Sequence, residues 1–252
     1  MHSPETKIKR FKPAITWLFD LDNTLHDASH AIFPAINANM NSYMAQVLGQ
    51  DGRPADPATV DAVRLDYWRR YGATLLGMVK HHGVRAADFL QAAHQFDNLP
   101  SMIRAERGLD RLLRRLPGRK ILLTNAPRGY SHEVMRHLGL HRHFARHIAI
   151  ESMMVHGQLR PKPSRLLLRK IVTRERLAAR RCILVEDTAP TLKAAKTLGL
   201  RTAWITRYLG RATRRTGVTA TPHPAALTKC PIYVDVKVKS IAELAKRLRH
   251  LR

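Results

Sequence analysis

Short, strongly apolar segments recur along the chain and predict the strands of a sheet. In chain order they are AITWLF (14–19), KILLT (120–124), HIAI (147–150), CILVE (182–186), TAWI (202–205) and IYVDV (232–236). The runs ILL and ILV inside them show no alternation of polar and apolar residues, which is typical of strands buried on both faces. Helix-sized segments that end in Gly separate several of these strands. The pattern predicts an α/β fold, with a parallel sheet covered by helices.

The long stretch between the first two predicted strands has helical periodicity. Apolar residues recur there at spacings of four, three and four, namely Ile36, Met40, Tyr43 and Val47. Further helices are expected over residues 57–72, which begin at a Pro and end at a Gly, and within residues 86–96. We therefore predict an all-helical insertion over residues 26–104, with residues 1–25 and 105–252 forming the sheet domain.

Composition narrows the class of protein. A hydrophobic fraction of 44% is enough for a buried core, which excludes wholesale disorder. The longest uncharged stretch, residues 28–50, contains Asn, Ser and Gln and cannot span a membrane. No apolar run follows the basic N-terminus, and Cys182 and Cys230 are too few for a disulfide framework. We therefore expect a protein of the reducing cytoplasm with no membrane partner. A separate expectation is a long mobile loop at residues 211–231, which are rich in Thr, Pro and Arg.

Charge is the least ordinary property of the chain. It has 44 Lys and Arg against 19 Asp and Glu, a formal net charge of +25. Residues 1–126 contain 17 basic and 12 acidic side chains, whereas residues 127–252 contain 27 and 7. Such a surface can attract nucleic acid, an anionic membrane or phosphorylated small molecules. The alternative is that the charge serves solubility or follows a host-wide preference for Arg, and the sequence leaves both interpretations open.

Polar side chains cluster where the predicted strands end. Asp20 and Asp22 follow the first strand, Thr124 and Asn125 end the second, and Glu186 and Asp187 end the fourth. Carboxyl ends of parallel strands meet at one edge of a sheet, which is where ligands bind in open α/β folds. Crowded carboxylates need a cation or a shared proton to relieve their repulsion. Magnesium is the candidate cation, because it is a hard ion that favours oxygen ligands.

Four of these segments, FDLDNT, LLTNA, the Lys162 of PKPS and LVEDT, resemble in their order the four motifs of the haloacid dehalogenase superfamily of phosphohydrolases. The resemblance extends over nearly the whole chain. It implies a Rossmann-like core and identifies the helical insertion as a cap domain placed after the first motif.

The resemblance also implies roles, and the chemistry of phosphate monoesters agrees with them. Hydrolysis needs a placed nucleophile, an acid for the leaving alkoxide and a cation. Asp20 is expected to attack phosphorus and form an aspartyl phosphate, while Asp22 acts as general acid and then general base. Thr124, the main chain of Asn125 and Lys162 are expected to bind the phosphoryl group. The expected Mg²⁺ ligands are Asp20, the main-chain carbonyl of Asp22, and Asp187, with Glu186 either a ligand or a neighbour of one.

The cap segments NSYMAQVLG, YWRRYGATLLGM and HQFD resemble the pyrimidine 5'-nucleotidase branch. The favoured substrate is therefore a pyrimidine nucleoside 5'-monophosphate, and Trp68, with Tyr67 and Tyr71, is a candidate to stack on the base. A sugar phosphate or phosphoglycolate phosphatase and a phosphomutase remain alternatives within the superfamily. An alternative of another class is a nucleic-acid-associated binding protein on an inactive hydrolase fold.

One position departs from the family pattern. Many members carry Asp or Asn four residues after the metal-binding Asp, and this chain has Thr191 there. We expect this change to alter the surroundings of the metal site or to be silent.

Overall fold

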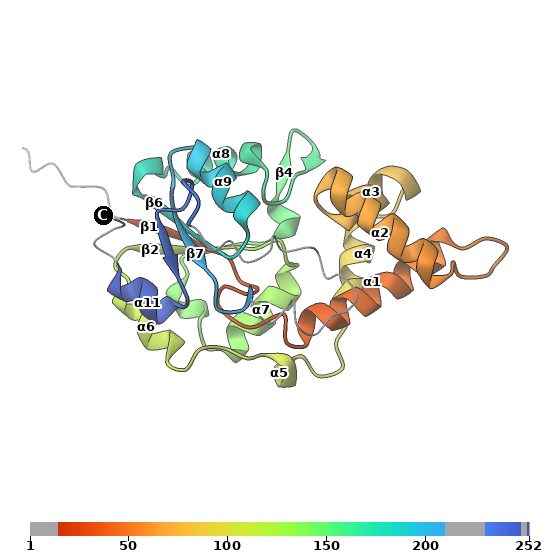
Figure 1. Cartoon of the computed structure of the whole chain (residues 1–252), viewed down its shortest axis with the longest axis horizontal. Helices are drawn as coiled ribbons and strands as arrows, with labels where there is room; N and C mark the ends of the chain where they lie inside the picture. The colour runs from red at the N-terminus through yellow and green to blue at the C-terminus, as the bar shows by residue number, and fades with distance from the viewer. Residues whose placement is uncertain (1–14, 210–229, 248–250, 252) are drawn as a thin grey trace, which may run out of the picture.

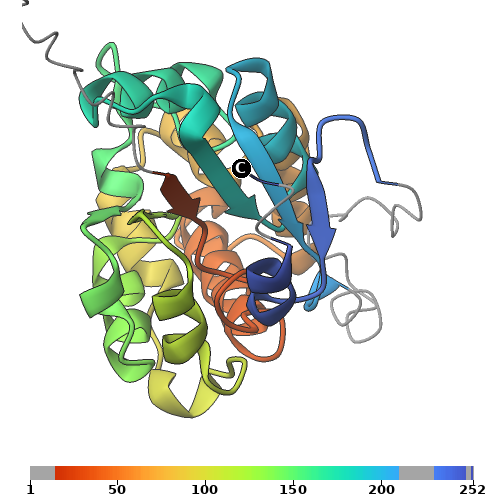
Figure 2. The ribbon, with the colours of Figure 1, turned by 90° about the vertical axis from the view of Figure 1, so that its left-hand side faces the viewer.

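Six parallel strands form the central sheet in the order β3-β2-β1-β6-β7-β8. The computed structural model describes residues 15–209, 230–247 and 251. The strands of the sheet are β1 (Thr16–Phe19), β2 (Arg119–Leu123), β3 (Arg146–Ile148), β6 (Cys182–Glu186), β7 (Arg201–Ile205) and β8 (Val236–Val238). The sheet lies at the left of Figure 1 and is seen with its flanking helices in Figure 2. The α/β prediction is confirmed.

Two details of the strand prediction are wrong. The last strand was expected over residues 232–236 but begins only at Val236, because the main-chain N–H of Val234 donates to the carbonyl of Pro231 (2.9 Å) and closes a turn. A small antiparallel hairpin of β4 (Met154–Val155) and β5 (Gln158–Leu159) was not expected at all. Strands of two residues are too short to produce a recognisable alternation.

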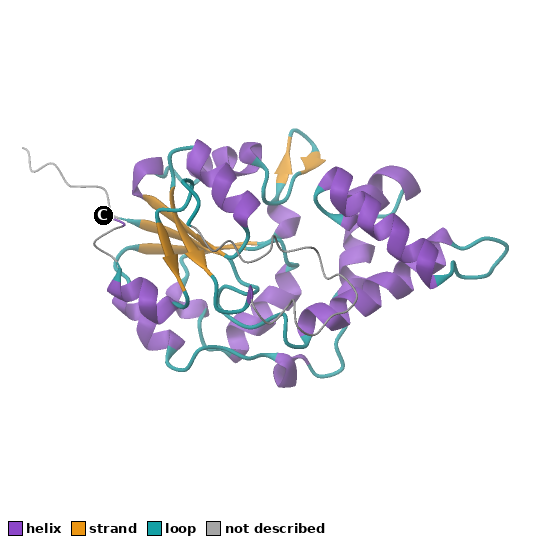
Figure 3. Cartoon of the chain, viewed as in Figure 1, coloured by secondary structure: helices purple, strands orange, loops and turns teal. Residues whose placement is uncertain are grey.

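Helices cover both faces of the sheet (Figure 3). The α-helices are α1 (Ile32–Leu48), α2 (Pro57–Tyr71), α3 (Thr74–His82), α4 (Ala86–Ala93), α5 (Leu99–Met102), α6 (Leu109–Arg115), α7 (Arg128–His137), α8 (Arg165–Arg174), α9 (Ala189–Thr197) and α11 (Ile241–Lys246). Short 3₁₀ turns are η1 (His141–His143), η2 (Ile150–Ser152) and η3 (Ala179–Arg181). Trp17 and Phe19 of β1 pack toward α6, α7 and α11, while Leu18 packs toward α8 and α9. Both faces of β1 are therefore buried, as its uniformly apolar sequence predicts.

Helices α1 to α4 pack together at the right of Figure 1 around a hydrophobic cluster. Each helix contributes buried residues to it, among them Met44 of α1, Val60 of α2, Met78 of α3 and Phe89 of α4, and Ile150 of η2 joins the cluster from the sheet domain. The predicted helix over residues 57–72 is confirmed as α2, which starts at Pro57 and ends before Gly72. The helix expected within residues 86–96 is present as α4.

The two segments that join these helices to the sheet run side by side. The main-chain N–H of Asp27 donates to the carbonyl of Arg104 (2.7 Å), and His26 forms a β-bridge with Ala105. This pairing supports the predicted boundaries of the insertion at residues 26 and 104, which we retain as a proposal. The expected loop at residues 211–231 lies almost wholly outside the described residues. Within the described part of the chain, none of the helices has the length and apolar character needed to cross a membrane.

Candidate active site

Asp20 and Glu186 come together because β1 and β6 are parallel neighbours in register. Phe19 pairs with Val185, so the next residue of each strand, Asp20 and Glu186, lies at the same edge of the sheet. The main-chain N–H of Asp20 donates to the carbonyl of Val185 (3.0 Å) and fixes the end of β1. Both side chains are buried, with relative exposures of 6% and 1%.

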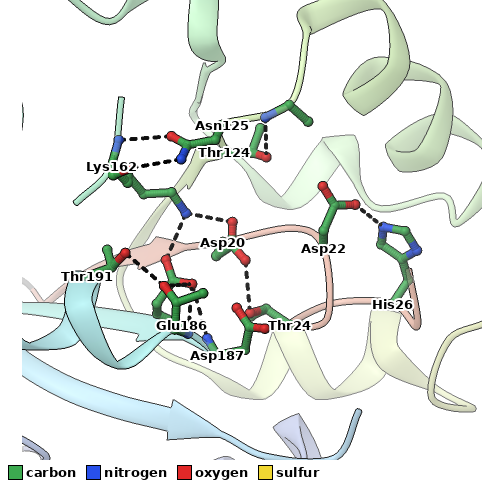
Figure 4. A network of polar contacts seen from close by, with 12 residues as sticks. Asp20, Asp22, Thr24, His26, Thr124, Asn125, Lys162, Glu186, Asp187 and Thr191 are labelled. Carbon is green, nitrogen blue, oxygen red and sulfur yellow. Dashed lines mark hydrogen bonds and ion pairs between the residues drawn. The ribbon is translucent and has the colours of Figure 1, made fainter. Parts of the chain in front are cut away.

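Lys162 connects these two carboxylates (Figure 4). Its Nζ donates to Oδ1 of Asp20 (2.6 Å) and to Oε2 of Glu186 (2.8 Å). The ammonium group is itself buried, so its charge is poorly screened by water. The predicted grouping of Asp20, Lys162 and Glu186 is present in the structure.

Glu186 has protein donors on both carboxylate oxygens. Oε2 accepts from Lys162, while Oε1 accepts from the main-chain N–H groups of Asp187 and Thr188 (3.2 Å each) and from the Thr188 hydroxyl (3.0 Å). Oxygen atoms of Asp20, Glu186 and Asp187 nevertheless lie within 4.8 Å of one another. The three carboxyl groups therefore form one buried acidic cluster, with Glu186 as its most fully hydrogen-bonded member.

The electrostatics of this cluster indicate a shortage of positive charge. Burial, together with the negative charge of Glu186, raises the pKa of Asp20 to about 7, although Lys162 opposes the rise. Burial and the charges of Glu186 and Asp20 raise the pKa of Asp187 well above its usual range. Burial also acts to raise the pKa of Glu186, but Lys162 and the hydrogen bonds outweigh it and hold that pKa below its usual value. Among the described residues of this cluster, the single ammonium group of Lys162 is set against three carboxyl groups. A divalent cation would supply the missing charge, and carboxylate oxygens are the ligands Mg²⁺ prefers.

Thr124 and Asn125 follow β2 beside this cluster. The Thr124 hydroxyl accepts from the main-chain N–H of Ala126 (3.1 Å) and is buried. The Asn125 amide makes two bonds to the main chain of Lys162: Nδ2 donates to its carbonyl, and Oδ1 accepts from its N–H, each at 2.9 Å. The Asn125 side chain therefore holds the Lys162 loop in place, which leaves its main chain as the group expected to meet phosphate.

Asp22 faces a different set of partners. Its Oδ1 lies 2.8 Å from Nε2 of His26 and accepts from the Tyr130 hydroxyl at 2.6 Å. Burial acts to raise the pKa of Asp22, but these hydrogen bonds and the charge of His26 lower it further than burial raises it. Neither His26 nor Tyr130 belongs to the site predicted from the sequence. Tyr130 lies 108 residues from Asp22 in the chain and follows the second motif, and no local periodicity marks it.

The aromatic residues of α2 are placed in the helical region. Tyr67 and Tyr71 pair with α3, where their hydroxyls lie 2.7 Å from His82 and 2.6 Å from His81. Trp68 is partly exposed, and its side chain makes no hydrogen bond or ring contact with another described residue. No described contact joins Trp68 to the acidic cluster, and its predicted contact with a substrate base remains a prediction.

Thr191 lies near the start of α9 and reaches the acidic cluster through one intervening residue, Thr188. Its hydroxyl oxygen lies 2.8 Å from that of Thr188, and the Thr188 hydroxyl donates to Glu186. Thr191 therefore acts on the site through Thr188 and Glu186. Trp204 of β7 adds support by donating its ring N–H to the carbonyl of Asp187 (2.9 Å).

A family model agrees with this geometry. The model described as haloacid dehalogenase-like hydrolase matches residues 16–199. That span begins at β1, ends just after α9 and includes all four motifs.

Solved structures with similar folds include enzymes of two activities. The chain is 15% identical to a HAD phosphatase from Thermococcus onnurineus, with a TM-score of 0.58 over 93% of this chain and 97% of that one. It is 17% identical to an L-2-haloacid dehalogenase from Xanthobacter autotrophicus with chloropropionic acid covalently bound, with a TM-score of 0.53 over 93% and 98%. It is 16% identical to a HAD-hydrolase from Bacillus subtilis bound to magnesium, with a TM-score of 0.54 over 94% and 100%. At these identities the likeness shows a shared fold.

Proposed function

The chain belongs to the haloacid dehalogenase-like hydrolases, and from that premise we propose that it is a magnesium-dependent phosphatase that hydrolyses a small phosphate monoester through an aspartyl phosphate on Asp20. A pyrimidine nucleoside 5'-monophosphate is the favoured substrate, on the resemblance of the helical segments to the nucleotidase branch. A cytoplasmic location is part of the same proposal.

The observation that favours a phosphatase over a dehalogenase is the presence and position of Asp22. A halide leaves carbon as a stable anion and needs no proton, whereas the alkoxide of a phosphate ester needs one. A second carboxyl group two residues after the nucleophile, with Oδ1 held by two donors, supplies a proton donor for that oxygen. Phosphate ester hydrolysis uses this group as a general acid, whereas dehalogenation has no leaving group that requires a proton.

The first half-reaction forms an oxygen–phosphorus bond to Asp20 and breaks the bond between phosphorus and the leaving oxygen. Asp22 gives its proton to that oxygen, so an alcohol departs. The free Asp22 carboxyl has a lowered pKa, but a phosphate dianion bound beside it raises that pKa because like charges repel. Lys162, Thr124 and the main chain of Asn125 are proposed to hold the phosphoryl oxygens while the bonds exchange.

In the second half-reaction, water attacks the phosphorus of the aspartyl phosphate. Asp22, now ionised, takes a proton from that water, and Asp20 is regenerated as inorganic phosphate leaves. Mg²⁺ bound by Asp20 and Asp187 would supply the positive charge that keeps Asp20 ionised and neutralises the phosphoryl group. Glu186 accepts four hydrogen bonds from protein donors, whereas Asp20 accepts two, from Lys162 and Thr24, so we assign Glu186 to holding Lys162 and supporting the metal site.

A phosphate-release screen tests the proposal. Protein stripped with EDTA is assayed with added Mg²⁺ or Ca²⁺ on pyrimidine and purine nucleoside monophosphates, sugar phosphates, phosphoglycolate and, for halide release, L-2-chloropropionate. We expect phosphate release that requires Mg²⁺ and is poorly supported by Ca²⁺, whose larger and looser ligand shell misplaces Asp20. Full activity in chelator would refute the metal site, and halide release without phosphate release would refute the phosphatase. A preference for phosphoglycolate or a sugar phosphate would support the proposed reaction and contradict the proposed nucleotide substrate.

A further inference from the structure

We propose that Tyr130 and His26 are positioning residues that orient the Asp22 carboxyl group for proton transfer to the leaving oxygen. The inference rests on the proposed phosphatase function and adds to it two residues outside the four motifs.

Both donors bind the same oxygen of Asp22. The Tyr130 hydroxyl donates to Oδ1 at 2.6 Å, and Nε2 of His26 lies 2.8 Å from the same atom. The two donors are themselves 3.5 Å apart, so they converge on Oδ1 from neighbouring directions. A carboxyl group anchored at one oxygen cannot rotate freely, and Oδ2 is left as the oxygen that carries the mobile proton.

The environment of His26 defines its role as a donor. The residue is fully buried, and its Nδ1 has no hydrogen-bond partner among the described residues. Nε2 faces Oδ1 of Asp22, and a carboxylate oxygen accepts, so we assign Nε2 as the donor nitrogen. His26 therefore directs the Asp22 carboxyl group through this hydrogen bond.

Local sequence places His26 within reach of Asp22. Asn23 adopts a positive φ of 58°, and the main-chain N–H of Leu25 donates to the carbonyl of Leu21 (2.8 Å). The Asn23 side chain stabilises this turn, because its Oδ1 accepts from the main-chain N–H of Ser29 (3.1 Å). The turn brings His26, four residues after Asp22, back beside the carboxyl group (Figure 4).

Tyr130 is held from the helical region. Its ring centroid lies 5.2 Å from that of His94 and 5.7 Å from that of Phe96, both in the segment after α4. Nδ1 of His94 lies 2.9 Å from the carbonyl of Leu90, which fixes its ring against α4. Residues of the predicted cap therefore support the ring whose hydroxyl binds Asp22.

The test compares two phosphate esters that differ in their need for an acid. A nucleoside 5'-monophosphate releases an alkoxide that must be protonated, whereas p-nitrophenyl phosphate releases a stable phenolate. Tyr130→Phe and His26→Leu each remove one donor from Asp22 and retain Asp20, Lys162 and the carboxyl group itself. We expect kcat/KM to fall roughly 10- to 100-fold on the nucleotide, within the range of general acid catalysis, and less than about 3-fold on p-nitrophenyl phosphate. His26→Gln, which keeps an N–H donor, is expected to recover most of the nucleotide activity.

Matched controls separate this effect from loss of stability. Tyr43→Phe changes a tyrosine that packs on Phe89 in the helical region. His143→Leu removes another histidine bonded to an aspartate, the partly buried His143, which contacts Asp110 (2.7 Å). Both should leave the ratio of the two kcat/KM values unchanged, and thermal unfolding is recorded for every variant.

Selective loss on the nucleotide with recovery in His26→Gln supports the proposal. Equal loss of kcat/KM on both esters in the variants, or no loss on either, overturns the positioning role. The proposed function stands in that case as long as the wild type releases phosphate. A wild type that releases phosphate from neither ester contradicts the proposed function, and the positioning role with it. If Tyr130→Phe fails to fold, the two His26 variants decide the outcome.

Discussion

At the scale of single residues, Lys162 organises the acidic cluster. Its ammonium group contacts Asp20 and Glu186, and its main chain is held at both polar groups by Asn125. The surrounding carboxylates raise the pKa of Lys162 further than burial lowers it, so the group stays charged. Even so, burial and charge crowding leave the pKa values of Asp20 and Asp187 raised. This excess of carboxyl groups supports the proposed Mg²⁺ site, and the role of each carboxylate can be tested separately.

Asp20→Asn is expected to abolish turnover and leave the fold intact. An amide cannot attack phosphorus as an anion, and it is a weaker ligand for Mg²⁺. Phosphate release should fall to background, while thermal unfolding in EDTA stays cooperative. The rise in Tm on adding Mg²⁺ should also be smaller than in wild type, because that rise reports binding to the folded state. Asp66→Asn, which alters an exposed ion pair with Arg70, is the matched control. Appreciable turnover by purified Asp20→Asn would exclude the aspartyl phosphate.

At the scale of helices and strands, close packing and side-chain anchors decide where elements lie. Helix α3 approaches α2 closely at Gly77, where an added Cβ would lie 2.1 Å from Cγ and 2.5 Å from Cβ of Tyr67. Strand β8 is fixed by Asp235, whose Oδ2 accepts from the main-chain N–H of Thr202 (2.8 Å) and whose Oδ1 accepts from Lys196 (2.5 Å). Each contact predicts a distinct change in stability.

Gly77→Ala is expected to destabilise the protein. Alanine favours helix by about 1 kcal/mol over glycine, but overpacking against the rigid base of Tyr67 costs about 1–3 kcal/mol. A net loss of up to about 2 kcal/mol should appear in urea unfolding. The same change at Gly129, in α7, meets no atom within 4 Å and should be neutral or stabilising by about 0.4–1 kcal/mol. Equal effects at the two positions would contradict the close approach of α2 and α3.

Asp235→Asn is expected to lower Tm at neutral pH and to matter less in acid. Burial acts to raise the pKa of Asp235, but Lys196 and the bonds from Thr202 lower it further. A carboxyl whose pKa is lowered on folding stabilises the protein above its unfolded pKa, near 3.9, and loses this effect as the pH falls through the lower folded value. The difference in Tm between wild type and variant should therefore shrink below about pH 4. A constant difference across that range would show that Asp235 acts through its shape alone.

Trp68→Ala tests whether α2 contributes to substrate choice. Tyr67 and Tyr71 are paired with histidines of α3, so Trp68 is the aromatic residue of α2 left to stack on a base. Stacking worth about 1–3 kcal/mol predicts a loss in kcat/KM of roughly 5- to 150-fold on a nucleoside monophosphate. A small aryl phosphate should be nearly unaffected. Tyr67→Phe, which keeps the ring packed on α3, should leave the ratio unchanged. Equal loss on both substrates in Trp68→Ala would assign Trp68 to the packing of the helices.

At the scale of the whole molecule, positive charge gathers in the second half of the chain. Basic residues on the outer side of α8 and the segment that follows are exposed and form no ion pair with another described residue; they are Arg165, Arg169, Lys170, Arg174, Arg176 and Arg180. A net charge of +25 raises the local concentration of phosphate dianions around the protein. This field acts on every phosphorylated substrate, whereas α2 can act only on those with a base.

Added salt is therefore expected to lower kcat/KM for the nucleotide and for the aryl phosphate to a similar degree. The Debye length falls from about 30 Å at 0.01 M salt to about 3 Å at 1 M, so long-range attraction is lost across this range. We expect kcat/KM to fall by roughly threefold or more for the nucleotide and the aryl phosphate in parallel, with kcat little changed. Values independent of salt would assign the charge to solubility. Salt-sensitive retention on RNA by a chain without phosphatase activity would favour the nucleic-acid-binding alternative.

Much of the fold and part of the site could be predicted from the sequence. Buried strands such as β1 and β6 are uniformly apolar, and parallel neighbours place their carboxyl ends at one edge. The strand ends therefore brought Asp20, Glu186 and Asp187 into one predicted group, and the resemblance to the four motifs added Lys162. The α2 helix was equally clear, since Pro57 and Gly72 mark its ends.

Other features depended on contacts between distant segments. Tyr130 binds Asp22 across 108 residues, and the Asn125 side chain proved to hold the Lys162 loop. The sequence alone could not set the start of β8 or reveal a hairpin of two-residue strands. Periodicity indicates which face of a helix or strand is buried. It does not indicate which polar group of another element contacts a side chain on that face. Hydrogen-bond partners are fixed only when the elements pack, and the tertiary structure alone decided them.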